Sequence, residues 1–238
     1  MGCESTAPHV CLRLLFTATL TVTLTAFAFW SDSYSVQLSD SWRNWLGFSS
    51  LSLPELRWHQ TLTSLVLTAG ERQFVQSILM LCISVGMCEW HFGSRPAIKV
   101  FFASHLIVTV GLALFFVLPL HLGGAGWATA LASERDVGPS AGYYGCLGAV
   151  LTSLKNPQRT YLICVVMVIL IGRLAMSSVS IHLHPSTVSA DLSHIAAFPL
   201  GMLLTYAGFS DPGRRVSASQ KPTHTTRDER CYVGEDLS

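Results

Sequence analysis

Charged residues are scarce in this chain of 238 residues. Asp, Glu, Lys and Arg make up 12% of it, whereas soluble domains carry about 25%. The formal net charge is +1, and no basic stripe interleaved with aromatic residues is present. The composition therefore disfavours a soluble domain and gives no argument for a nucleic-acid partner.

Metal-ligand and disulfide spacings are also missing. The chain has seven cysteines, but none forms a Cys-x-x-Cys pair or a Cys/His pattern with zinc-site spacing. Four of them, Cys82, Cys88, Cys146 and Cys164, lie inside apolar runs, where cysteine behaves as a small hydrophobic residue. We therefore expect no metal, no cofactor and no disulfide framework.

Long apolar runs are what the chain has instead. Hydrophobic residues make up 50% of it, and a helix needs about 20 mostly apolar residues to cross a membrane. Six spans are predicted: Val10–Trp30, Phe74–Trp90, Ala97–Leu120, Ser140–Leu154, Thr160–Met176 and Val188–Phe209. The fourth is short, so we expect it to begin below the membrane surface and to be shielded by neighbouring helices. The predicted fold is an all-α, multi-pass membrane bundle that sits in a lipid bilayer.

The remaining segments complete this organisation. A short N-terminal segment (1–9) precedes the membrane domain (10–209), and a polar tail (210–238) is expected to be disordered. Residues 31–60 are rich in Trp and Arg, which predicts a loop in the headgroup zone. Lys and Arg are more frequent on the side of the two termini, which predicts that both termini are cytoplasmic. The opening Met-Gly-Cys matches an acylation pattern at Gly2 and Cys3, which we interpret as a chance match beside a membrane span.

Two polar residues in the predicted helices carry candidate chemistry. Ser140 opens the fourth span and His194 lies in the sixth, and by parity these spans run in the same direction. Ser140 follows Asp136 by four residues and His194 follows Asp191 by three, so both side chains lie roughly 5–6 Å below those acidic markers. A serine and a histidine at one depth suit nucleophilic catalysis, in which the imidazole takes the hydroxyl proton.

Small residues recur around both positions. The two stripes consist of Ser140, Tyr144 and Gly148 in the fourth span and of His194, Ala197 and Gly201 in the sixth. Facing stripes of this kind let membrane helices approach closely, and Tyr144 is placed to stack on the imidazole. Spacing alone leaves an ordinary interpretation open, because a membrane serine often bonds its own backbone and a membrane histidine is often a packing residue.

At these residues the sequence resembles the rhomboid superfamily of intramembrane serine proteases. The family's helix-four motif, Gly-x-Ser-Gly with Tyr at +4 and Gly at +8 from the serine, is matched by Gly138, Ser140, Tyr144 and Gly148. In the helix-six motif, His194 and Gly201 match, while Ala197 replaces a glycine. The resemblance covers roughly residues 50–208 and is closest to the divergent, actinobacterial-type rhomboid-like branch.

The resemblance implies a six-helix core and a Ser–His dyad that cleaves single-span membrane proteins. Ser140 is then the nucleophile and His194 the general base. The orienting and oxyanion-hole groups are expected from Tyr144, Gly138, Gln76 and the backbone N–H of Ser140. No metal or cofactor is implied, and the partner is a transmembrane helix, as substrate or as client.

Two departures from the family keep an alternative open. Ala141 stands where a glycine follows the nucleophile, and the helix-two His-x-x-x-Asn is absent, its nearest equivalents being Arg72 and Gln76. Loss of one oxyanion donor typically costs ~10²–10³ in rate. The alternative is a catalytically inactive rhomboid-like protein that binds transmembrane helices as an adaptor or chaperone. A transporter or channel is disfavoured, because Arg173 and Pro199 are isolated and no internal repeat is visible.

Overall fold

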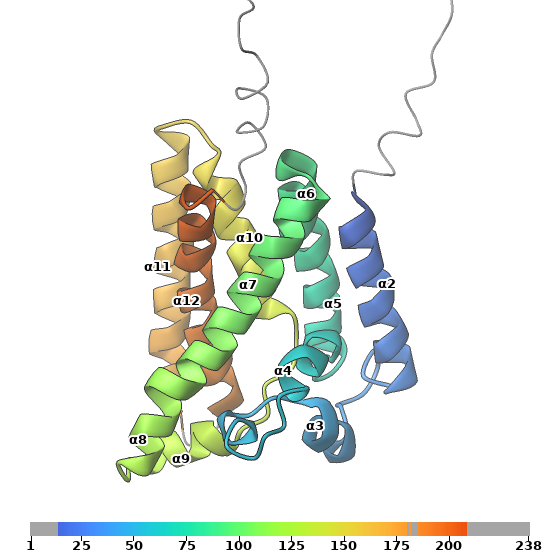
Figure 1. Cartoon of the computed structure of the whole chain (residues 1–238), viewed down its shortest axis with the longest axis vertical. Helices are drawn as coiled ribbons and strands as arrows, with labels where there is room; N and C mark the ends of the chain where they lie inside the picture. Colours follow the sequence, from blue (N-terminus) through green and yellow to red (C-terminus); the bar gives the residue numbers. More distant parts are fainter. Residues whose placement is uncertain (1–13, 180, 182–184, 209–238) are drawn as a thin grey trace, which may run out of the picture.

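The structure is a computed structural model of a helical bundle (Figure 1). The residues that it describes are 14–179, 181 and 185–208. Three predictions lie outside them, namely those for segments 1–9 and 210–238 and for acylation at Gly2 and Cys3. All regular elements within the described residues are helices, which confirms the all-α prediction.

Four described helices are long and apolar enough to cross a membrane. They are Glu71–Phe92, Ser94–Leu122, Gln158–Ser178 (α11) and Pro185–Tyr206 (α12). The first of these helices consists of α5 (Glu71–Met80), the π-helical η4 (Leu81–Val85) and α6 (Gly86–Phe92). The second consists of α7 (Ser94–Leu112), the π-helical η5 (Ala113–Val117) and α8 (Leu118–Leu122). Their bounds match four predicted spans to within three residues, and the chain has the character of a multi-pass membrane protein.

The other two predicted spans are shorter helices. α2 (Leu15–Trp30) has 16 residues and α10 (Ser140–Thr152) has 13, both below the ~20 residues that crossing a membrane requires. By length and composition, four of the described helices are therefore candidate spans, and the predicted count of six is not confirmed. α10 is about 20 Å long, and every residue in it except Leu147 is buried, so the predicted shielding of this helix is confirmed.

α10 occupies the centre of the bundle, packed mainly against α12 and α7 (Figure 1). It runs in the same direction as α12, as the parity of the spans predicted. A methyl group on Gly201 of α12 would overlap the backbone carbonyl of Gly145, and one on Gly148 would overlap the carbonyl of Phe198. The two backbones touch because no side chain separates them, which confirms the close approach predicted from the small-residue stripes.

α11 lies at the periphery and presents an apolar surface outward. Only Leu170 and Ser177 are buried in it. Large hydrophobic side chains such as Val168, which is 69% exposed, and Met176, which is 77% exposed, cover its outer face. A continuous apolar surface of this kind is typical of a helix that contacts lipid.

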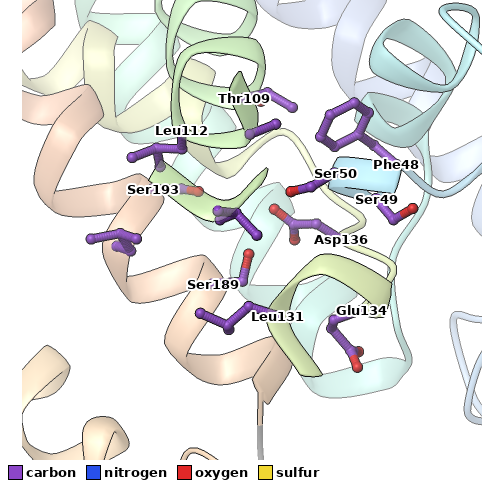
Figure 2. Close-up of a pocket in the computed structure, with 13 residues that line it drawn as sticks. Phe48, Ser49, Ser50, Thr109, Leu112, Leu131, Glu134, Asp136, Ser189 and Ser193 are labelled. Atoms are coloured by element: carbon purple, nitrogen blue, oxygen red, sulfur yellow. The ribbon is translucent and has the colours of Figure 1, made fainter. Parts of the chain in front are cut away.

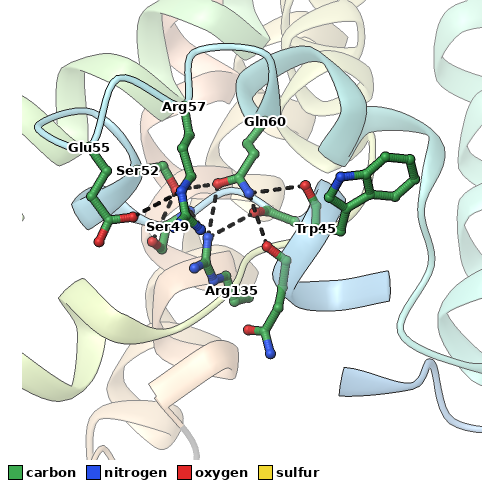
Figure 3. A network of polar contacts seen from close by, with 9 residues as sticks. Trp45, Ser49, Ser52, Glu55, Arg57, Gln60 and Arg135 are labelled. Atoms are coloured by element: carbon green, nitrogen blue, oxygen red, sulfur yellow. Dashed lines mark hydrogen bonds and ion pairs between the residues drawn. The ribbon is translucent and has the colours of Figure 1, made fainter. Parts of the chain in front are cut away.

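The segment predicted as an interfacial loop, residues 31–60, is partly folded onto the bundle instead. With the residues that follow, it forms α3 (Asp40–Leu46), η2 (Ser50–Ser52), α4 (Gln60–Thr63) and η3 (Ser64–Val66). Gln60 is 1% exposed; its amide donates to the carbonyl of Trp45 at 3.0 Å and its oxygen accepts from Arg135 at 2.9 Å (Figure 3). Trp45 and Trp58 stay exposed, so only part of the segment has an interfacial character. A further short helix that was not predicted, α9 (Gly126–Ser133), follows α8.

A buried carboxylate joins α2 to the rest of the bundle. Glu89 of α6 is fully buried. One of its oxygens accepts from the backbone N–H of Phe16 at 2.9 Å and from the Ser94 hydroxyl at 2.6 Å. The other accepts from the N–H and the hydroxyl of Thr17, at 2.8 and 2.7 Å. The carboxylate thus satisfies free N–H groups at the start of α2, where negative charge is favoured.

The contact between α10 and α12 predicts a large effect of one methyl group. Gly201→Ala forces the two backbones apart, and we expect it to lower the free energy of unfolding by about 1–3 kcal/mol. The matched control is Gly172→Ala in α11, where a methyl group meets nothing within 4 Å and helix propensity favours alanine. Thermal unfolding in detergent micelles measures both. Equal midpoints for the two variants would contradict the close packing described above.

The four hydrogen bonds to Glu89 predict a cost for Glu89→Gln. Both Glu89 oxygens accept hydrogen bonds, so the NH2 group of glutamine would face hydrogen-bond donors in either orientation of the amide. We therefore expect the free energy of unfolding to fall by about 2–4 kcal/mol. Glu55→Gln is the control, because Glu55 forms only a half-exposed ion pair with Arg57 at 3.2 Å, and such pairs contribute about 0–1 kcal/mol. Denaturant unfolding in micelles compares them, and a smaller effect at Glu89 than at Glu55 would refute the prediction.

Candidate functional site

Ser140 is the first residue of α10. The first N–H groups of a helix have no partner within it, and a partial positive charge gathers there. The Ser140 hydroxyl therefore lies beside backbone groups that can stabilise a developing negative charge. A helix beginning at this residue is what the sequence predicted.

The backbone before Ser140 is fixed by the loop segment that precedes α5. Asp136 and Phe48 form an antiparallel bridge: the Phe48 N–H donates to the Asp136 carbonyl at 3.0 Å, and the Asp136 N–H donates to the Phe48 carbonyl at 2.7 Å. One residue earlier, the Arg135 guanidinium donates to Gln60 and to the hydroxyl of Ser52 at 3.2 Å (Figure 3). The folded loop thus sets where α10 begins.

Two further bonds shape the turn itself. The Gln73 amide of α5 donates to the Val137 carbonyl at 2.8 Å, and the Gly138 N–H donates to the Ser64 carbonyl at 2.7 Å. Gly138 has a φ of +120°, which favours glycine. Since its N–H already has a partner, Gly138 shapes the turn and offers no free donor to an oxyanion. Gln73 is a residue that sequence reasoning missed, because no motif marks it.

His194 lies on α12 with 4% of its surface exposed. The Tyr144 ring packs on the imidazole, with centroids 4.3 Å apart and planes inclined by 32°. Neither imidazole nitrogen makes a hydrogen bond within the described part of the chain. One ring face is therefore held in place, while the nitrogens stay available for proton transfer.

Three of the five predicted site residues line one cavity of about 260 Å³. Ser140, His194 and Gln76 all line it. The other lining residues are largely polar and include Arg43, Gln73, Arg135, Asp136, Tyr143 and Arg173. The Gln76 amide has no hydrogen-bond partner among the described residues and also borders a second polar cavity, of about 430 Å³. Arg72, the other residue that stands in place of the family's helix-two His-x-x-x-Asn, lines the second cavity and not the first.

An ion pair with a buried carboxylate adjoins the histidine. Asp191, which is 2% exposed, lies one turn before His194 on α12. One of its oxygens is 2.8 Å from the Arg173 guanidinium of α11 and 3.8 Å from Nδ1 of His194. This pairing was not predicted, because residues on two helices meet only once the helices pack.

Asp136 separates the cavity of Ser140 from a smaller one of about 30 Å³. Figure 2 shows the Asp136 carboxylate among Ser50, Ser189 and Ser193. Burial raises the pKa of this carboxyl from 3.8 to about 6; a hydrogen bond from the Val137 backbone opposes the rise and the nearby charge of Glu134 adds to it. The ionised form is thus disfavoured in the folded protein.

The raised pKa predicts a pH-dependent effect of Asp136→Asn. The folded protein binds this proton more tightly than the unfolded chain does, so wild-type stability falls as pH rises from about 4 through about 6. The neutral amide removes that loss. We expect the midpoint of thermal unfolding, variant minus wild type, to be higher at pH 7.5 than at pH 4.5. An identical difference at the two pH values would show that the carboxyl carries no burial penalty.

Among the described residues, no group of three or more His, Cys, Asp or Glu side chains is placed to hold a metal ion. The four cysteines within these residues are all free. In comparisons with known proteins, no family model, no curated protein and no solved structure matched the chain. The family resemblance therefore rests on the residues of the motifs.

Proposed function

We propose that this chain is a rhomboid-like intramembrane serine protease with a Ser140–His194 dyad. The observation that carries the proposal is that Ser140, at the start of a buried helix, and His194, stacked on Tyr144, line the same polar cavity. Both residues line this cavity because α10 and α12 pack against each other, which supports the proposed pairing. Polar groups held inside a membrane bundle usually serve a function.

The proposed mechanism gives each group a role. His194 takes the proton from the Ser140 hydroxyl as the oxygen attacks a peptide carbonyl, and passes it to the leaving amine. Water then hydrolyses the acyl-enzyme, with His194 again as the base. The free N–H groups at the start of α10 and the Gln76 amide face the developing oxyanion, with Gln76 in place of the family's helix-two residues.

The membrane setting defines the substrate class. In this proposal α2 and α10 complete a six-helix core, with α10 shielded from lipid and both termini cytoplasmic. α2 begins and α12 ends at the same end of the bundle (Figure 1), in keeping with an even number of spans. The substrate is a single-span protein whose helix unwinds near small or helix-breaking residues and enters the cavity from the bilayer.

One observation favours the second candidate function, a non-catalytic protein that binds transmembrane helices. The Gln73 amide of α5 already donates to the Val137 carbonyl, and the Gly138 N–H already donates to the Ser64 carbonyl. Gln76 is then the one side chain of α5 that lines the Ser140 cavity without a hydrogen bond in the described structure. An oxyanion hole with too few donors would leave the same cavity as a binding site.

A fluorophosphonate probe separates the two functions. We expect it to label the wild type covalently and to leave Ser140→Ala unlabelled, while His194→Ala labels at least about 10²-fold more slowly because the hydroxyl loses its base. Ser189→Ala is the control, since Ser189 lines the neighbouring cavity, and we expect it to label like the wild type.

Labelling is read by in-gel fluorescence on detergent-purified full-length protein. Absence of label from a folded wild type would refute the protease and favour the helix-binding protein. Persistence of label in Ser140→Ala would place the nucleophile elsewhere.

A further inference from the structure

Asp191, which is buried, and Arg173, which is partly exposed, form an ion pair that the dyad mechanism does not use. Asp191 is 2% exposed, and a carboxylate at such a position is costly unless it is paired. Its partner, Arg173, comes from α11, a helix with few buried residues, and its side chain is 42% exposed. The pair therefore joins the lipid-facing helix to the helix that carries His194.

The Asp191 carboxylate also lies beside His194, so its ion pair with Arg173 can do more than link two helices. The Asp191 oxygen that contacts Arg173 is also 3.8 Å from Nδ1 of His194. Tyr144 covers one face of the same imidazole. The ring is thus bounded by an aromatic face and by a negative charge beside one nitrogen, which leaves Nε2 as the nitrogen away from the carboxylate.

We propose that Asp191, held in place by Arg173, is a positioning residue for His194, so that the site works as a Ser–His–Asp arrangement whose carboxylate is clamped by a cation. This inference rests on the proposed function. A separation of 3.8 Å is too long for a hydrogen bond, but such contacts tighten when the imidazole becomes charged in the reaction.

Asp191 acts through His194 and does not touch the substrate. The proton moves from the Ser140 oxygen to Nε2, while the bond from that oxygen to the peptide carbon forms. It then moves to the amine nitrogen as the carbon–nitrogen bond breaks. Asp191 takes no part in the proton transfer; it favours the tautomer with its proton on Nδ1 and stabilises the imidazolium. Arg173 fixes the carboxylate and offsets the cost of burying its charge.

Two variants test this assignment on the full-length protein. Asp191→Asn keeps the shape of the side chain and removes its charge. We expect the maximal rate of fluorophosphonate labelling to fall by about 10²-fold or more, with the concentration for half-maximal rate little changed, because the probe's binding surface is intact. Asp191→Glu restores a carboxylate, and we expect it to recover part of the rate.

A charge swap distinguishes positioning from a merely structural role. Arg173→Asp with Asp191→Arg restores an ion pair between α11 and α12 but places a cation beside His194. We expect thermal stability closer to that of the wild type than Asp191→Asn shows, without recovery of labelling. Recovery of labelling by the swap would overturn the proposal and leave the pair as a structural link.

Folding and function are read separately in these experiments. Rates are expressed per folded protein, measured by size-exclusion chromatography in detergent. If the swap fails to fold, Arg173→Gln replaces it: this variant keeps the carboxylate and loses its clamp, and we expect slower labelling than in the wild type. Wild-type labelling with an unchanged rate in Asp191→Asn overturns the positioning role alone, whereas absence of wild-type labelling overturns the protease and this inference together.

Discussion

The direct contact between the backbones of α10 and α12 is the constraint on which the rest of the structure depends. Gly145 and Gly201 meet without an intervening side chain, and Gly148 meets the backbone of Phe198. In a membrane, helices gain little from the hydrophobic effect when they associate, so close packing and polar contacts must hold them together. A larger residue at these positions would move His194 away from the cavity that Ser140 lines.

The chain between Phe48 and Gln73 adds a second constraint, on the backbone that precedes α10. Residues 135–138 are each bonded to the chain between Phe48 and Gln73, through side chain or backbone. The start of α10 is therefore set by contacts outside the helix. Catalytic groups work best when their positions are fixed before substrate binds. These contacts fix the backbone beside Ser140, the proposed nucleophile, and Tyr144 packs on the ring of His194, the proposed base.

Charge is rare in this chain, and the structure concentrates buried charge at a few points. Glu89 accepts hydrogen bonds from the start of α2, and Asp191 forms an ion pair with Arg173 beside the candidate base. In both cases several donors or a cation offset the cost of burial. In the sequence, Asp191 indicates only how deep His194 lies in its span. Its pairing with Arg173 could not be predicted, because helical periodicity shows which residues share one face of a helix but not how two helices are rotated relative to each other.

The sequence by itself determined the positions of the long apolar helices, the start of α10 at Ser140 and the close approach of α10 to α12, because apolar length and small-residue spacing are local properties of the chain. It did not determine that the loop folds onto the bundle. Only the tertiary structure decided which polar side chains meet, among them Gln60 with Arg135 and Gln73 with Val137. These contacts join residues more than sixty positions apart, and their formation depends on the packing of whole helices.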